Sequence, residues 1–564
     1  MYGAFPPGHT GSNVNGQGKG DNVFNKSSTR RRTFAGVLVA AALAGSFLPA
    51  SAEAKPGTGC EQRNNNQYDK LLECVTLAGV REHQAALQAI ADDNGGTRAA
   101  QTPGYEASVD YVEQTMLAAG WEVDRVEFQY VAETDAGLEQ LTPVVASYET
   151  GGFSGSGGGD VTDDVVAVDI NLVPPRANTS GCDGAFTEAL VGAPLVADPA
   201  GPDDFAGFPA GAIALIQRGG CSFALKAHNA EAAGASAVII FNQGNTPDRE
   251  PLFIGNATAP NVDDLGALEI PVVGASFQQG AALAQPGSTA RVFVVLTTFT
   301  AENVIAELEG RNDDNVVMAG AHLDSVDEGP GINDNGSGSA ALLEIAENLA
   351  NHHPVNTLRF AWWGAEELGL IGSTQWVNQR SPEELDEIAL YLNFDMIGSP
   401  NYFIGVYDAD QSSYNAPVAV PAGSIAIEDV FESYYTLVGE PYDDTEFSGR
   451  SDYQAFINND IPSSGLFTGA EVQKNAEQAT IWGGVVGAQF DPCYHQACDT
   501  FANNADHALD VNADAIAFAV LTFAYSTESV NGVVGKAVPD SAPLATPAGP
   551  EGTCPAGPTV TCKL

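Results

Sequence analysis

The sequence predicts an α/β fold in which a mostly parallel sheet is covered by helices on both faces. The prediction rests on short apolar segments that alternate with longer segments of helical periodicity between residues 299 and 531. Continuous apolar strands separated by helices are typical of parallel sheets that are buried on both faces. The predicted strands are 316–320, 358–363, 390–394 and 464–467, and an apolar helix is predicted over 340–349.

Two helices and a strand are predicted ahead of this region. Apolar residues recur at helical spacing between 80 and 90 and between 109 and 116, and each pattern ends at glycine. Apolar and polar residues then alternate over 126–130, as in a half-buried strand. The Gly- and Ser-rich stretch 147–163 that follows indicates a boundary.

Residues 164–298 have the pattern of a separate module. A buried strand and turn over 213–223, a helix through 226–234 and an apolar strand over 237–242 predict a β-α-β unit. A chain of 564 residues is too long for one hydrophobic core, so two domains plus tails are expected. Past Asn531 the chain is rich in Pro, Ala and Gly, which predicts a tail.

The charge of the chain excludes some classes of partner. Its 23 basic and 72 acidic side chains give a formal net charge of −49. So acidic a surface repels nucleic acid and anionic membranes, and neither is expected as a partner. A solvated acidic surface without a specific partner is the favoured interpretation of this charge.

The N-terminus has the pattern of an export signal. Three arginines at 30–32 precede an apolar run over 34–48, and small residues follow over 50–54. The apolar run is too short to span a membrane, and this order of segments is typical of a signal peptide. The stretch 31–34 also resembles a twin-arginine signal, although arginine precedes the pair, so both export routes stay open. We expect a secreted protein, extracellular or periplasmic, without a membrane anchor.

All eight cysteines follow this segment. An even number in an exported chain favours disulfides, and zinc–thiolate sites are disfavoured because no C-x-x-C pair is present. Spacing suggests pairing between neighbours along the chain, although it does not determine the connectivity. The suggested pairs are Cys60 with Cys74, Cys182 with Cys221, Cys493 with Cys498, and Cys554 with Cys562.

Two histidines and four carboxylates form the candidate functional site. Histidine nitrogen and carboxylate oxygen together suit zinc or a similar divalent ion. A two-metal hydrolytic site also needs a base that activates the attacking water, and one carboxylate is left over for that role. The six residues are His322, Asp334, Glu366, Glu367, Asp395 and His495.

The placement of these residues supports a shared site. His322 follows one predicted strand, Glu366 and Glu367 follow a second, and Asp395 follows a third. Ligands of open α/β sheets bind outside the carboxyl ends of the strands, so three segments converge on one edge. Any one of these residues alone would be read as a surface or hydrogen-bonded residue, but their joint placement makes chance convergence improbable.

Five stretches resemble, in type and order, the secreted di-zinc leucine aminopeptidase family of co-catalytic zinc exopeptidases. No metal-ligand position departs from the family pattern, and the resemblance covers roughly residues 60–530. The strand-Arg-Gly-x-Cys-x-Phe-helix series at 213–234 resembles the protease-associated domain found in some of its members. The N-terminal extension and the Cys554–Cys562 tail are not explained by the family core. The five stretches are 322–325, 331–338, 361–369, 393–400 and 491–500.

The resemblance implies a role for each residue. His322 and Asp395 would hold one zinc ion, Glu367 and His495 a second, and Asp334 would bridge them. Glu366 would be the general base that takes a proton from the attacking water and delivers it to the leaving amine.

Further roles follow from the same resemblance. Asp324 would orient a ligand histidine, with a capping or turn residue as the alternative. The Tyr494 hydroxyl would hydrogen-bond the tetrahedral oxyanion, with a structural aromatic as the alternative. Arg450 would contact substrate in the pocket for the free amino terminus, which Glu366 and Asp395 would also recognise.

These inferences together predict a secreted zinc aminopeptidase that is a monomer, binds two zinc ions and removes leucine-like N-terminal residues from peptides. We expect a three-layer αβα catalytic domain with an inserted protease-associated domain. The alternatives are a carboxypeptidase of the same superfamily, a one-zinc glutaminyl-cyclase relative and a binding protein on a non-catalytic peptidase scaffold. The expected divisions are 1–54 for the signal peptide and N-terminal extension, 55–150 and 299–531 for the catalytic domain, 151–298 for the protease-associated domain, and 532–564 for the tail.

Overall fold

The computed structural model describes residues 59–60, 63–176, 180–186, 203–258 and 267–550. The predicted export signal and the predicted Cys554–Cys562 pair lie outside the described residues. The other three predicted disulfides are formed, with Cα–Cα distances of 5.6 Å for Cys60–Cys74, 5.7 Å for Cys182–Cys221 and 5.3 Å for Cys493–Cys498.

A large mixed sheet positions the candidate site. The four strands that the sequence predicts, β9, β8, β10 and β13, form its parallel centre, and they lie in that order. Antiparallel pairs add β7 beside β9 and β11 beside β13, and β12 lies parallel to β11 at the edge. The strands are β7 (Thr289–Leu308), β8 (Asn312–His322), β9 (Asn356–Trp363), β10 (Ile388–Phe394), β11 (Gly405–Tyr407), β12 (Asp443–Thr445) and β13 (Ser463–Phe467).

Side chains alternate between two buried cores on the two faces of this sheet. Along β9, Leu358, Phe360 and Trp362 join one core, and Ala361 and Trp363 join the other. This alternation gives the three-layer αβα arrangement that the sequence predicts. The first core is covered by α1 (Tyr68–Leu72), α2 (Leu77–Asp93), α3 (Pro103–Ala119), α8 (Gly336–Leu349), α11 (Ser424–Val438) and α14 (Asp506–Tyr525), and the second by α9 (Ile371–Asn378), α10 (Pro382–Asp386) and α12 (Tyr453–Ile457).

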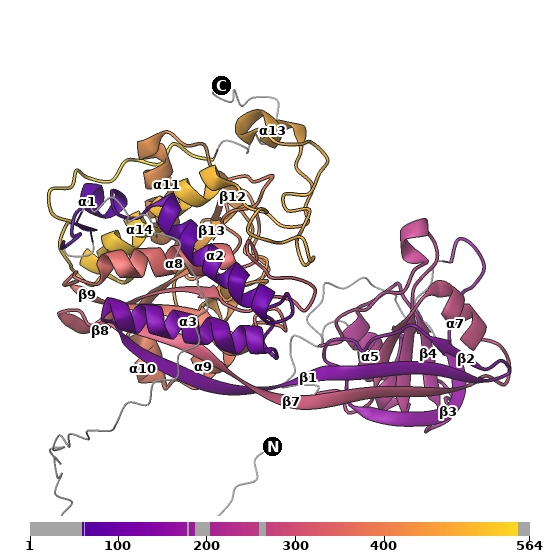
Figure 1. Ribbon diagram of the computed structural model, residues 1–564. Coiled ribbons are helices and arrows are strands. Elements are labelled where there is room, and N and C mark those ends of the chain that lie inside the picture. The colour runs from indigo at the N-terminus through magenta and orange to yellow at the C-terminus, as the bar shows by residue number, and fades with distance from the viewer. Residues whose placement is uncertain (1–58, 61–62, 177–179, 187–202, 259–266, 551–564) are drawn as a thin grey trace, which may run out of the picture. The chain divides into compact units, whose positions relative to one another are not determined.

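The predicted module shares two long strands with this sheet. β1 (Glu122–Thr142) and β7 pair antiparallel from Glu122 opposite Glu307 to Thr142 opposite Thr289 (Figure 1). One end of β7 pairs with β9 and the other with β3. The predicted β-α-β unit is β4, α5 and β5. β2 (Ala146–Tyr148) pairs with β1 just before the module, which contains β3 (Gly159–Val168), β4 (Ile213–Gln217), α5 (Phe223–Ala232), β5 (Ala237–Phe241), the 3-10 helix η2 (Pro247–Arg249), β6 (Val272–Ala275) and α7 (Phe277–Leu283).

Helix α14 is an apolar core helix. Among the described residues it alone is long and apolar enough to cross a membrane, but 78% of that apolar stretch is buried within the protein. Its buried residues include Ile516, Phe518 and Val520, which belong to the larger core. Packing against the sheet and the neighbouring helices accounts for its composition. Two short helices, α13 (Ala476–Trp482) and α15 (Glu528–Asn531), precede and follow it.

Candidate metal centre

The carboxyl ends of three parallel strands place four of the six predicted site residues together. His322 is the last residue of β8, Asp395 directly follows β10, and Glu366 and Glu367 follow β9. β9 and β10 both pair parallel with β8, so the three ends meet at one edge of the sheet.

Loops bring Asp334 and His495 to the same edge. His322 Nε2 lies 3.3 Å from Asp334 Oδ1 and 3.3 Å from Asp395 Oδ1. His495 Nε2 lies 3.3 Å from Asp334 Oδ2 and 2.9 Å from Glu367 Oε2. The donor atoms form two groups that share Asp334, namely His322–Asp334–Asp395 and Asp334–Glu367–His495.

The residues fit a pair of zinc ions. Each group offers one imidazole nitrogen and two carboxylate oxygens, a donor set that zinc prefers. Asp395 Oδ1 and Glu367 Oε1 are buried and have no hydrogen-bond partner. Buried carboxylate oxygens without a partner are costly, and a cation held by each of the two groups would satisfy them.

Glu366 lies beside both groups without belonging to either. Its Oε2 atom is 3.9 Å from His322 Nε2, and its side chain lines the pocket that opens on the site. The residue left over in the sequence is thus a buried carboxylate next to the two groups of candidate metal ligands. That is the location a general base needs.

Asp324 contacts both His322 and the Glu366–Glu367 pair. Its main-chain oxygen lies 3.1 Å from His322 Nδ1, and its Oδ1 atom lies 3.6 Å from the same nitrogen. The two carboxylate oxygens accept hydrogen bonds from the main-chain nitrogens of Glu366, at 3.2 Å, and Glu367, at 3.3 Å. One buried side chain therefore fixes three of the predicted site residues.

Sequence reasoning missed Ser451 and Asp452. Ser451 Oγ donates a 2.7 Å hydrogen bond to Asp395 Oδ2 and accepts one of 2.8 Å from Asn393 Nδ2. Asp452 is buried at the start of α12, and burial raises its pKa to about 7 against the opposing effect of His322. Ser451 directly follows Arg450 in the sequence and Asp452 comes next, which is the signal that could have found them.

Sequence reasoning also missed Asp499. Its two carboxylate oxygens accept 2.9 Å hydrogen bonds from the main-chain nitrogens of Asn333 and Asp334. Asp499 directly follows Cys498, so the chain segment that carries His495 also holds the loop that carries Asp334. The hydrogen bonds of Asp499 therefore connect the loop that carries Asp334 to the segment that carries His495.

The loop that carries His495 has a left-handed backbone and a disulfide. His495 has φ 55°, a conformation that non-glycine residues seldom adopt, and the Cys493–Cys498 bond encloses it. The Tyr494 ring stacks on the His495 ring at 3.8 Å between centroids. Tyr494 Oη accepts a 3.1 Å hydrogen bond from Arg450 Nη2.

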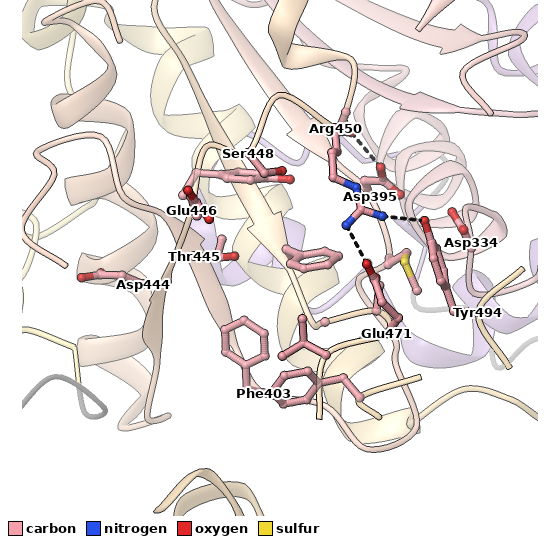
Figure 2. A pocket seen from close by; sticks show the side chains of 18 of the residues that line it. Asp334, Asp395, Phe403, Asp444, Thr445, Glu446, Ser448, Arg450, Glu471 and Tyr494 are labelled. Carbon is pink, nitrogen blue, oxygen red and sulfur yellow. Dashed lines mark hydrogen bonds and ion pairs between the residues drawn. The ribbon is translucent and has the colours of Figure 1, made fainter. Parts of the chain in front are cut away.

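Arg450 is exposed at the rim of the pocket. Its Nη1 atom lies 2.8 Å from Glu471 Oε1, so the guanidinium joins Glu471 to Tyr494 (Figure 2). Burial, followed by the charges of Asp334 and Glu367, raises the pKa of Tyr494. Its hydroxyl therefore keeps its proton and can donate a hydrogen bond.

Crowded carboxylates dominate the electrostatics of the site. Burial and the charge of Asp334 raise the pKa of Glu367 to about 8, and burial raises that of Glu366 well above its usual value. Burial alone would lower the pKa of His495, but hydrogen bonds to Asp334 and Glu367 raise it to about 10. The site thus holds protons that a bound cation would displace.

A cavity of about 330 Å³ opens on these residues. Figure 2 shows Asp334, Asp395, Tyr494, Arg450 and Glu471 on one side and Asp444, Thr445 and Glu446 on the other. Its volume is in the range of pockets that bind small ligands. Apolar walls come from Met396, Phe403, Phe467, Val472 and Phe490.

Comparison with known proteins agrees with this geometry. Residues 303–520 match the model of peptidase family M28, and residues 161–283 match that of the PA domain. An aminopeptidase of Pseudomonas aeruginosa is 46% identical over 477 residues, which cover 83% of this chain and 84% of the relative. Leucine aminopeptidase 2 of Trichophyton rubrum is 44% identical over 322 residues, 56% of this chain and 63% of that protein.

Among solved structures, a zinc aminopeptidase from Bacillus subtilis has the same fold. It superposes with a TM-score of 0.55 at 24% identity, over 79% of this chain and 94% of that one. The PA match lies between two parts of one structural core, since α2 and α3 pack with α8. The chain therefore belongs to the aminopeptidases of peptidase family M28 and carries an inserted PA domain.

Proposed function

We propose that the protein is a secreted aminopeptidase that binds two zinc ions and removes leucine-like residues from the N-termini of peptides. The observation that carries the proposal is the pair of donor groups that share Asp334, with the unassigned carboxylate Glu366 beside them. A zinc aminopeptidase of the same fold and relatives named leucine aminopeptidases support the metal and the substrate.

In this proposal His322 and Asp395 would hold one zinc ion, Glu367 and His495 would hold the other, and Asp334 would contribute to both. Two zinc ions, when bound, supply the Lewis acidity that makes water nucleophilic at neutral pH and polarises the scissile carbonyl. Asp324, Ser451 and Asp499 hold the ligands in place through the contacts described above.

Glu366 accepts the proton of the attacking water and returns it to the nitrogen of the leaving peptide. Tyr494 donates its hydroxyl hydrogen bond to the oxyanion of the tetrahedral intermediate. Arg450, bonded to Tyr494 Oη, positions that hydroxyl and contacts substrate from the rim of the pocket.

The free amino terminus of the substrate is a cation, and the pocket offers it carboxylates. Glu366 and Asp395 line the pocket next to the reacting centre. The first side chain of the substrate would occupy the apolar part of the same cavity, between Phe403, Phe467 and Phe490. A carboxypeptidase would instead need a cationic group for the substrate carboxylate, and the one basic residue lining this pocket, among those the structure describes, is already paired with Glu471.

Export of the protein is part of the proposal. Three disulfides among the described residues support an oxidising compartment. N-terminal sequencing of the protein recovered from culture medium would test it, with cleavage near residue 54 as the expected result. Domain limits at 55–150, 151–298 and 299–531 and a monomeric state stay predictions that limited proteolysis and light scattering would check.

Hydrolysis of a leucyl anilide tests the activity directly. The purified protein should cleave the free-amine anilide but not its N-acetylated form. A strong chelator should abolish cleavage, and zinc should restore it. Cleavage of neither substrate, with C-terminally free peptides hydrolysed instead, would favour the carboxypeptidase alternative. No hydrolysis of either class would favour a binding protein.

A further inference from the structure

A second group of buried carboxylates lies at the edge of the sheet formed by β11 and β12. Glu428 and Glu432 stand one helical turn apart on α11 and so share a face of the helix. Asp444 reaches them from β12, and one oxygen from each of the three carboxylates lies within 4.8 Å of the others. Asp408 and Asp410, which follow β11, form a neighbouring group with Glu428.

Two carboxylates in this cluster have oxygen atoms without the hydrogen bonds or ion pairs that a buried charge requires. Glu432 is only 8% exposed, and within the described ranges its side chain has no hydrogen bond or ion pair. Asp444 is 1% exposed, and its Oδ1 atom is buried without a partner. No lysine or arginine of the described chain forms an ion pair with Glu428, Glu432 or Asp444. An isolated buried carboxylate is strongly unfavourable, so these oxygens are suited to bind a cation.

The other oxygens of the cluster are held by the protein itself. Glu428 Oε2 accepts hydrogen bonds of 3.1 Å from the main-chain nitrogens of Ala409 and Asp410. Asp444 Oδ2 accepts hydrogen bonds from the hydroxyls of Ser412 and Ser413. These bonds fix two of the three carboxylates in position and leave oxygen atoms free to bind a cation.

We propose that Glu428, Glu432 and Asp444 form a calcium site. The donors are all oxygen, which favours a hard cation over zinc. Calcium binds oxygen ligands in flexible geometry, whereas magnesium demands a near-ideal octahedron and gives up its water reluctantly, so a set of buried protein carboxylates favours calcium.

The electrostatics of the cluster agree with a cation-binding role. Burial, with Glu432 and then Asp410 as the next causes, raises the pKa of Glu428 to about 9. Burial and the charge of Asp444 raise the pKa of Glu432 to about 8. Without a cation both groups would stay protonated at neutral pH, and a bound calcium ion would release those protons.

The proposed site adjoins the substrate pocket through Asp444. Asp444 and Tyr414 line the pocket, but Glu428 and Glu432 do not. Figure 2 shows Asp444 on the side of the pocket away from Arg450 and Tyr494. A small ion bound by Glu428, Glu432 and Asp444 would stabilise this part of the pocket wall. The proposal does not depend on the peptidase reaction.

Calcium titration of the zinc-loaded full chain tests the proposal, because occupied zinc sites cannot take up the added ion. Isothermal titration calorimetry should show one calcium ion per chain, and the unfolding temperature should rise by a few degrees with calcium. Glu432→Gln and Asp444→Asn should each weaken calcium binding at least tenfold. The control Asp429→Asn, an exposed carboxylate on the same helix, should bind within about twofold of wild type.

The same measurements identify the competing explanation. If the carboxylates are simply protonated, Glu432→Gln will stabilise the protein to the same extent with and without calcium, and wild type will show no calcium-dependent shift. That result, or equal calcium affinity in wild type and both variants, would overturn the calcium site. Magnesium should bind more weakly than calcium, and tighter magnesium binding would overturn the assignment of the ion.

Discussion

Ser451 Oγ donates a 2.7 Å hydrogen bond to one carboxylate oxygen of Asp395, while the other oxygen of Asp395 is buried and unpartnered 3.3 Å from His322 Nε2. The hydrogen bond fixes the rotation of the carboxylate, so that its free oxygen faces the histidine. A residue that contributes no metal-binding atom therefore determines how a proposed zinc ligand is presented.

Ser451→Ala should weaken zinc binding and activity together. Loss of a group that orients a metal ligand typically costs about 10–100-fold, and we expect the lower end, because Asp395 stays in place. Zinc affinity measured by competition with a chromogenic chelator would check this. Ser448→Ala is the matched control, since Ser448 lines the same pocket but does not bond to Asp395. Unchanged zinc affinity in Ser451→Ala would contradict the positioning role.

Glu366→Gln should separate catalysis from metal binding. The substitution keeps the shape of the side chain but removes its capacity to accept a proton, and loss of a general base lowers kcat by about 10²–10⁴-fold. Metal content, measured by mass spectrometry, should stay near that of wild type, because Glu366 belongs to neither donor group. Glu367→Gln should instead lose metal. If the two variants lost metal equally, Glu366 would be a ligand and not the base.

The strands and helices that carry the site were predictable because their apolar periodicity is strong. β10 is buried along its whole length and β9 at every position except Arg359, and the apolar segments 358–363 and 390–394 reflect this burial in the sequence. Only 126–130 was predicted from β1, because the rest of that 21-residue strand pairs with β7 while leaving many side chains exposed. Three-residue strands such as β11 and β12 are too short to show a periodic pattern of apolar residues in the sequence.

The ligand-supporting residues were harder to predict, for a different reason. Ser451 and Asp499 lie outside the helices and strands, and their partners Asp395 and Asp334 are 56 and 165 residues away in the sequence. Local patterns contain no information on such contacts, which exist only once the chain has folded. Glu428 and Glu432 illustrate the same limit, since two glutamates one turn apart on a helix usually face solvent, whereas here both are buried.

Replacing the Cys493–Cys498 pair with serines should affect the metal site more than global stability. A disulfide that closes so short a loop restricts the unfolded chain only modestly. The loop nonetheless holds His495 in its left-handed conformation, next to Asp499. We expect zinc affinity to fall about tenfold or more, while the unfolding temperature of the zinc-saturated protein changes little. Removing Cys60–Cys74, which lies outside the site, is the control and should leave zinc affinity unchanged.

The metal-free protein should lose stability as the pH rises, and the zinc-loaded protein should not. The pKa of Glu367 is about 8 in the folded chain, above its ordinary value near 4.5, so its protonated form is favoured by folding. That contribution is complete at low pH and is lost between about 4.5 and 8. The pKa of His495, about 10 against an ordinary 6.5, adds a contribution that is lost as the pH rises towards 10. Both groups therefore make the metal-free protein less stable as the pH rises.

Zinc reverses this dependence because it binds the deprotonated ligands. Its affinity therefore rises with pH, and the gap in unfolding temperature between zinc-loaded and metal-free protein should widen steadily from about pH 5.5 to about pH 8.5. Differential scanning fluorimetry with and without a chelator would measure the gap. Glu367→Gln, a neutral mimic of the protonated side chain, should flatten the metal-free curve. A metal-free unfolding temperature that stayed constant or rose over this range would show that the crowded carboxylates are already paired by some other means.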